Sequence, residues 1–125
     1  MIAADSSSII NFLSGADTAD RVRLRVALQA QELCLPPAVK TELLSGWPRA
    51  AGLEPLLHQA PLMTILDGYW ERAGSNRHLL VSKGLKAKLA DALIAQSCID
   101  ADVALIASDG DFRHFARWCG LKLAL

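Results

Sequence analysis

The stretch Val103-Ala-Leu-Ile-Ala107 decides the fold expected for this chain, because it is an uninterrupted apolar run of strand length. A strand that is apolar along its whole length is buried on both faces, which is typical of a parallel sheet. Ser108-Asp-Gly110 turns the chain directly after it, and residues 111–118 then place Phe112 and Phe115 on one face of a helix. The stretch therefore predicts a strand–turn–helix unit of an α/β fold.

Similar units are expected on the N-terminal side, and a last strand is expected after the helix. The other strands are predicted at residues 2–5, 32–35, 62–66 and 121–124. The other helices are predicted at 7–13, 18–30, 37–46, 53–58, 68–83 and 87–100, with Asp17 as an N-cap and breaks at Ser14-Gly15 and Gly84. This alternation predicts βα units that stack into one parallel sheet.

Length and composition narrow the class of protein. A chain of 125 residues with 52% hydrophobic content predicts a single compact domain over residues 1–125. Lys plus Arg equals Asp plus Glu at 13 each, so any nucleic-acid role must depend on local charge or on metal ions. No apolar run approaches the ~20 residues of a membrane span, and the first residues lack the basic segment of a signal peptide, so we expect a cytoplasmic protein.

The cysteines and tryptophans have structural interpretations. Cys34, Cys98 and Cys119 are odd in number and lack zinc-site spacing, so we expect buried, reduced thiols. The tryptophans are Trp47, Trp70 and Trp118, and we expect core or interface positions rather than base-stacking platforms.

Acidic residues stand where a chain of this size usually has apolar or neutral ones. Asp5 ends the first predicted strand, Asp91 interrupts an apolar helix, Glu42 lies in the helix after the second strand, and Asp109 follows the strand at 103–107. In an open parallel sheet these positions share the carboxyl edge, where ligands bind. Carboxylates that converge there cannot all ionise unless a cation meets them, and Mg²⁺ or Mn²⁺ prefers such oxygen ligands.

These acidic residues occur in motifs that resemble those of a known family. The motifs are Asp5-Ser-Ser7, Pro36-Pro-Ala-Val-Lys-Thr-Glu-Leu-Leu44, Asp91-Ala-Leu-Ile-Ala95 and Ala107-Ser-Asp-Gly-Asp-Phe112. In order and spacing they resemble the PIN-domain nucleases, and within them the VapC-type toxins of toxin–antitoxin pairs. The resemblance implies an α/β fold of PIN-like type, with three layers and a parallel sheet of strand order 3-2-1-4-5. It also implies a metal-dependent endoribonuclease that leaves 5′-phosphate and 3′-hydroxyl ends.

The resemblance also implies roles for particular residues. Asp5, Glu42, Asp91 and Asp109 would be catalytic, with Asp5 and Asp91 as the metal ligands. Ser7 and Asp111 would support them. The last motif often carries a threonine where this chain has Ala107, which leaves open whether Asp109 or Asp111 is the fourth acidic residue.

Partners follow from the same resemblance and from the charges near the motifs. Lys86 and Lys88, which precede Asp91, are predicted to hold RNA phosphates. The resemblance implies a homodimer and a cognate small antitoxin whose helix or tail covers the acidic pocket. The apolar helices at 7–13 and 18–30 have the character of a groove for such a partner.

Plainer interpretations stand beside these. Asp5 could cap the helix after it, Asp91 could pair with Lys88, and Asp109 could serve only its turn. Other functions also stay open: a PIN-like nuclease of RNA processing, an inactive protein-binding module, or a phosphohydrolase with Asp5 as nucleophile. The last lacks the second aspartate two residues after Asp5 that such enzymes carry.

Overall fold

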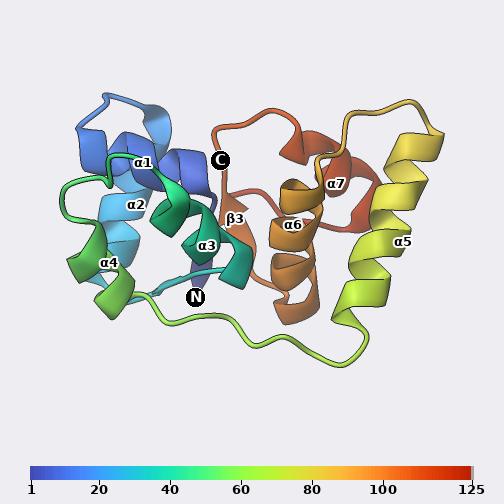
Figure 1. The fold of residues 1–125 in the computed structure, drawn as a ribbon, viewed down its shortest axis with the longest axis horizontal. Coiled ribbons are helices and arrows are strands. Elements are labelled where there is room, and N and C mark those ends of the chain that lie inside the picture. Colours follow the sequence, from blue (N-terminus) through green and yellow to red (C-terminus); the bar gives the residue numbers. More distant parts are fainter. Residues whose placement is uncertain (125) are drawn as a thin grey trace.

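The computed structural model describes residues 1–124 as a parallel sheet with helices on both sides (Figure 1). The chain order is β1 (Ile2–Ala4), α1 (Ser6–Ser14), α2 (Ala19–Gln29), β2 (Leu33–Cys34), α3 (Pro37–Ser45), α4 (Leu53–Gln59), α5 (Tyr69–Ser82), α6 (Leu89–Ala101), β3 (Ala104–Ile106) and α7 (Phe112–Cys119). Helices α1 and α2 lie on one side of β3, and α5, α6 and α7 lie on the other (Figure 1). The predicted α/β class is confirmed.

The sheet is built on β1, which pairs in parallel with β2 on one side and β3 on the other. Ala3 and Ala4 of β1 are fully buried, as are Leu105 and Ile106 of β3. Small side chains on the middle strand let helices approach it closely from both faces, since protein interiors pack without voids. Strand β1 therefore lies at the centre of the sheet and of the hydrophobic core.

The two outer strands that we expected are wrong in extent. At 62–66 only Leu62 bridges to Leu35, and at 121–124 only Leu123 bridges to Leu105. The run at 62–66 lies largely at the surface and buries only Met63, so its apolar character does not mark a buried strand. The order of the three inner strands agrees with the predicted 3-2-1-4-5 arrangement, and the two bridges lie at its outer places.

The helices agree with the predicted ones apart from their ends. Helix α1 ends at Gly15, whose φ of 78° suits a residue without a side chain. Helix α2 is capped at Thr18, so Asp17 is not the N-cap that we expected. Helix α6 begins two residues later than predicted, because the chain at Lys88 is extended and the Ala87 carbonyl accepts a hydrogen bond from Arg77 Nε at 2.8 Å.

Helix α6 is surrounded by protein and contacts α3, α5, α7 and β3. A polar network joins it to α5: Asn76 Nδ2 donates to Gln96 Oε1 at 2.8 Å, and Gln96 Nε2 donates to Asp100 Oδ1 at 2.8 Å. Arg72 donates two hydrogen bonds to Asp100, at 2.9 and 2.7 Å, and they hold the pKa of this carboxyl below its usual range. Such a bidentate pair fixes direction as well as distance, so α5 holds α6 in register.

The thiols agree with the expectation, whereas the tryptophans do not lie in the core. Cys34 and Cys98 are buried and Cys119 is partly buried, and all three are free. No tryptophan is buried in the core: Trp47 is 94% exposed and Trp118 is 41% exposed. Among the described residues, no helix is both long and apolar enough to cross a membrane.

A buried charge in α2 leads to a stability prediction. Asp20 is only 2% exposed, and neither of its carboxylate oxygens has a hydrogen-bond partner within residues 1–124. A buried carboxylate without partners costs several kcal/mol, which the N-terminus of α2 offsets only in part. We expect Asp20→Asn to raise the free energy of unfolding by about 1 kcal/mol or more in urea denaturation.

Asp17→Asn is the matched control, because it removes the same charge from an exposed residue at the start of the same helix. It should change stability by less than about 0.5 kcal/mol. A clear loss of stability in Asp20→Asn alone would mean that this carboxylate has a stabilising partner.

Candidate functional site

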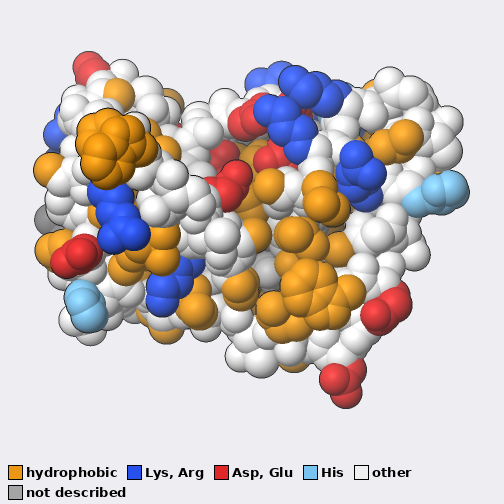
Figure 2. Space-filling view, viewed as in Figure 1, with side chains coloured by type: hydrophobic (Ala, Val, Ile, Leu, Met, Phe, Trp, Pro, Cys, Tyr) orange, Lys and Arg blue, Asp and Glu red, His pale blue; other side chains and the backbone are white. Residues whose placement is uncertain are grey.

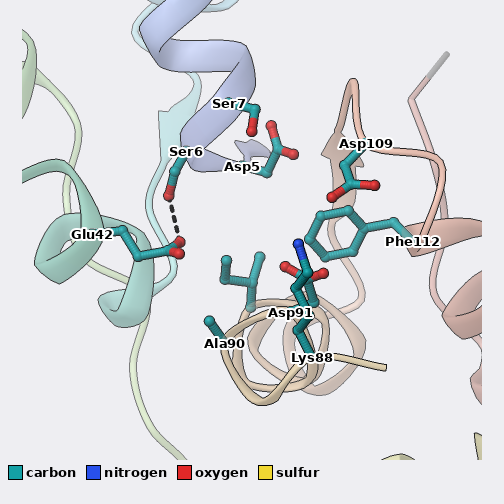
Figure 3. A pocket seen from close by; sticks show the side chains of 10 residues that line it. Asp5, Ser6, Ser7, Glu42, Lys88, Ala90, Asp91, Asp109 and Phe112 are labelled. Atoms are coloured by element: carbon teal, nitrogen blue, oxygen red, sulfur yellow. Dashed lines mark hydrogen bonds between the residues drawn. The ribbon is translucent and has the colours of Figure 1, made fainter. Parts of the chain in front are cut away.

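The candidate site is a cavity of about 130 Å³ beyond the carboxyl ends of β1 and β3 (Figure 3). Its acidic side chains come from four parts of the chain: Asp5 after β1, Glu42 of α3, Asp91 of α6 and Asp109 after β3. The cavity is also lined by Ser6, Ser7, Lys88, Ala90, Ile94 and Phe112. The structure thus brings together the four carboxylates that the sequence singled out.

Asp5 is both a helix cap and a wall of the cavity. Its Oδ1 accepts a hydrogen bond from the Ser8 backbone N–H at 2.8 Å, and its own N–H donates to the Ile106 carbonyl at 2.9 Å. Burial raises the pKa of this carboxyl, hydrogen bonding from Ser8 opposes the rise, and the charges of Asp109 and Asp20 add to it. The two interpretations of Asp5 are therefore compatible, because capping uses only one of its oxygens.

Glu42 reaches the cavity from the opposite wall, where a serine orients it. Ser6 Oγ donates a hydrogen bond to Glu42 Oε1 at 2.6 Å (Figure 3). The sequence had indicated Ser7 as the supporting hydroxyl, and Ser7 does line the cavity, but it makes no side-chain hydrogen bond within residues 1–124. Ser6 was missed because three serines follow Asp5 and spacing alone does not separate them.

Asp91 lies in the first turn of α6 and is 8% exposed. Its Oδ2 is buried and has no hydrogen-bond partner among the described residues. Burial first, and then the charge of Asp109, raise the pKa of this carboxyl to about 6. Lys88 opposes the rise but forms no ion pair with Asp91 among those residues, so local pairing does not account for this aspartate.

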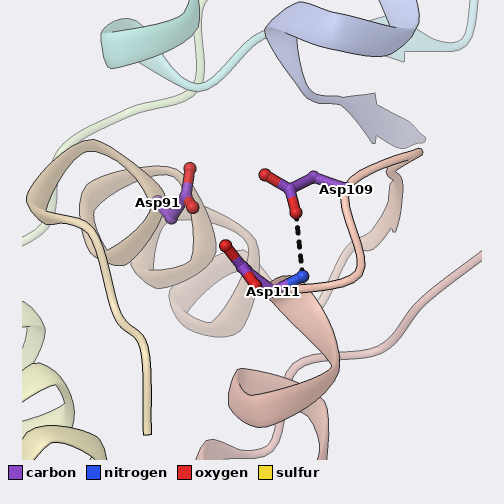
Figure 4. Close-up of side chains that lie close together, drawn as sticks. All are labelled: Asp91, Asp109 and Asp111. Atoms are coloured by element: carbon purple, nitrogen blue, oxygen red, sulfur yellow. Dashed lines mark hydrogen bonds between the residues drawn. The ribbon is translucent and has the colours of Figure 1, made fainter.

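Asp109 and Asp111 both approach Asp91, which bears on the fourth acidic position that the sequence left open. Each of the three residues offers one carboxylate oxygen, and these oxygens lie within 4.8 Å of one another (Figure 4). Asp109 Oδ1 accepts the Asp111 backbone N–H at 2.9 Å, and this bond shapes the turn. Asp111 also forms an ion pair with Lys86, whose Nζ lies 3.4 Å from Asp111 Oδ2.

The two lysines predicted to hold RNA are placed differently. Lys88 lines the cavity next to Asp91, whereas Lys86 lies outside it and is paired with Asp111. Both belong to the segment that joins α5 to α6. Positive charge therefore borders the acidic cavity on the side of α7.

The donor set fits a hard divalent cation. Carboxylate oxygens are the ligands that Mg²⁺ and Mn²⁺ prefer, and such ions are often held by one or two carboxylates plus water and substrate phosphate. Asp91, Asp109 and Asp111 could hold the ion between them. Asp5 lines the same cavity near Asp109 (Figure 3). Among the carboxylates that line the cavity, Asp91 has the buried oxygen without a partner, which a cation would satisfy.

Comparison with known proteins agrees with the fold. Residues 2–117 match the PIN domain family. No curated protein matches the chain. Two solved structures superpose over nearly its whole length. The first is VapBC2 from Rickettsia felis bound to a DNA fragment from their promoter, with a TM-score of 0.77, 19% identity and coverage of 98% of this chain and 97% of that one. The second is DNA-bound VapBC from Salmonella typhimurium, with a TM-score of 0.75, 17% identity and coverage of 98% of this chain and 97% of that one. At these identities the likeness shows a shared fold.

The raised pKa of Asp91 predicts a pH dependence of stability in chelator. The pKa of the Asp91 carboxyl is about 6 in the folded protein, whereas the unperturbed value of an aspartate is 3.8. Folding therefore favours the protonated form. This stabilisation is complete below pH 3.8 and is lost as the pH rises to about 6, with a magnitude of at most about 3 kcal/mol.

The measurement is urea denaturation in EDTA of the wild type and of Asp91→Asn across this pH range. The free energy of unfolding of the wild type should fall relative to that of the variant as the pH rises. Asp5 remains in both proteins, so its own titration largely cancels. A pH-independent difference would contradict the environment described for Asp91.

Proposed function

We propose that this chain, which belongs to the PIN domain family, is a metal-dependent endoribonuclease and the toxin of a VapBC-type toxin–antitoxin pair. The observation that carries the proposal is the buried, partnerless oxygen of Asp91 next to Asp109 and Asp111. A carboxylate cluster of this kind is costly for a scaffold and useful for a nuclease.

Each acidic residue of the cavity has a proposed role that follows from its position. A divalent cation, when bound, activates a water and offsets the charge on the phosphate. Asp5 and Asp91 are its proposed ligands, and Asp109 supplies a further oxygen with Asp111 in support. Ser6 holds Oε1 of Glu42, which leaves Oε2 free to accept a proton from the attacking water.

The remaining polar residues of the cavity would position the substrate. Lys88 stands next to Asp91, where its ammonium group suits a substrate phosphate. The Ser7 hydroxyl lies at the rim near Asp5 (Figure 3). In-line attack at the phosphodiester would leave a 5′-phosphate and a 3′-hydroxyl.

We extend the proposal to the protein partners of such a toxin. Val22 and Val26 are one turn apart on α2 and exposed, and they border an apolar cavity of about 290 Å³. An apolar helix of a small antitoxin would bury these side chains, and an arginine of its tail would pair with the acidic cavity. Both similar structures are described as VapBC complexes. A homodimer in the cytoplasm is part of the same proposal.

The activity is tested by incubating the purified protein with total RNA. We expect discrete fragments in Mn²⁺ or Mg²⁺, none in EDTA, and cleavage lowered about 100-fold or more by Asp91→Asn. Asp17→Asn, which removes an exposed carboxylate that does not line the cavity, is the control and should cleave as the wild type does. Mapping the ends should give 5′-phosphates.

Cleavage that persists in EDTA, or an Asn variant that cleaves at the wild-type rate, would overturn the mechanism. Absence of cleavage by a folded wild type, with metal bound, would favour the inactive protein-binding module. Cleavage without any effect of a co-expressed antitoxin candidate would favour a nuclease of RNA processing.

Metal binding is tested separately by thermal unfolding with added Mn²⁺. A ligand at 100 times its Kd stabilises the folded state by about 2.7 kcal/mol, so the Tm of the wild type should rise with Mn²⁺ concentration. The Asp5→Asn/Asp91→Asn double variant should show no such rise. An equal rise in both proteins would place the ion elsewhere.

A further inference from the structure

The segment 83–88, between α5 and α6, runs alongside α7. At its start Lys83 Nζ lies 3.9 Å from the ring centroid of Trp118, near the C-terminal end of α7. In its middle Lys86 Nζ lies 3.4 Å from Asp111 Oδ2, at the N-cap of α7. At its end Lys88 lines the acidic cavity. The segment thus leads from Trp118 to the candidate site.

Helix α7 presents its own cations along the same line. Phe112 and Phe115 are buried, which turns Arg113 and Arg117 outward at a spacing of one helical turn. The Arg117 guanidinium lies 4.9 Å from the ring centroid of Trp118. Trp118 therefore contacts two cations at once, Lys83 and Arg117, and orders them by cation–π attraction.

We call Lys83, Lys86, Arg113 and Arg117 the basic strip. Within residues 1–124 only Lys86 of these four forms an ion pair, so three cations stay without an acidic partner. The chain as a whole has a net charge of zero, so this accumulation is local. Figure 2 shows Lys and Arg side chains gathered over α6 and α7, directly next to an acidic recess.

We propose that the basic strip binds the phosphate backbone of the RNA strand that flanks the cleaved bond. The inference rests on the proposed function, since it places the substrate of the same site. Eight residues of α7 extend roughly 12 Å at ~1.5 Å per residue, which is long enough to contact successive phosphates of a single strand. Lys88 then continues the path into the cavity.

A nucleic-acid strand fits this surface better than an acidic protein segment does. The strip leads into a cavity walled by Asp91 and Asp109, which repels further carboxylates. A phosphate could enter such a cavity because a divalent cation held by these carboxylates would offset its charge. The strip is also held in place: Arg77 donates from Nε to the Ala87 carbonyl at 2.8 Å, which anchors the end of the segment.

The test measures binding of a fluorescent single-stranded RNA by anisotropy at 50 to 200 mM salt in EDTA, with RNA integrity checked on a gel. The variant is Lys83→Ala/Arg117→Ala. Each phosphate contact contributes about 0.7 to the slope of log Kobs against log salt, so we expect the slope to shrink by about 1.4. Affinity at 100 mM salt should fall about 10-fold.

The matched control is Arg23→Ala/Arg25→Ala, which removes two exposed arginines from α2 on the other side of the sheet. It should leave both slope and affinity within twofold of the wild type. Trp118→Leu keeps an apolar contact but removes the ring, so it should weaken RNA binding less than the double variant does. All variants should keep the wild-type Tm within a few degrees.

Equal effects of the two double variants, or no effect of Lys83→Ala/Arg117→Ala, would overturn the proposal. Loss of polyglutamate binding in that variant with RNA binding unchanged would instead assign the strip to an acidic protein. In Mn²⁺ the variant should raise KM for RNA and leave kcat unchanged. Failure of the wild type to cleave RNA would overturn the proposed function, whereas the binding comparison in EDTA would still decide the strip.

Discussion

The candidate site depends on negative charges that the fold holds together at one edge of a parallel sheet. The carboxyl ends of β1 and β3 bring Asp5 and Asp109 to this edge, and the N-terminal ends of helices bring Asp91 and Asp111 to meet them. Burial and the charge of Asp109 raise the pKa of Asp91 to about 6, so the cluster of carboxylates by itself opposes ionisation. A cation turns this cost into affinity, because every repulsion that it relieves strengthens its binding.

The well-packed core offsets the free-energy cost of holding these carboxylates together. Ala3 and Ala4 allow helices to pack closely on the middle strand, and α6 is covered on most of its surface. The polar network of Gln96 and Asp100 with α5 keeps α6 from rotating, which would move Asp91 out of the cavity. The hydrophobic core thus supplies the stability, and the network supplies the orientation.

Sequence patterns predicted the inner sheet, the helices and the convergence of the four carboxylates, because buried strands and helix faces have strong periodicities. They failed at 62–66, since an apolar run has the same composition whether it lies in a sheet or covers its edge. They also passed over Asp20, whose burial depends on how α2 packs on α1, and they did not separate Ser6 from Ser7. They allowed core or interface positions for the tryptophans, and none lies in the core, since composition does not tell which side chains point outward.

The deep burial of α6 has a consequence for regulation. Opening of a protein ranges from local fraying to global unfolding, and an element at the centre of the core opens only with the whole domain. Asp91 is part of α6, and the packing of this helix on α3, α5, α7 and β3 holds the residue in place. Under the proposed function, covering the cavity or withholding a cation would control the site without any rearrangement of α6. Inhibition of the proposed nuclease would then be a matter of access, and release of an inhibitor would restore a site that had stayed assembled.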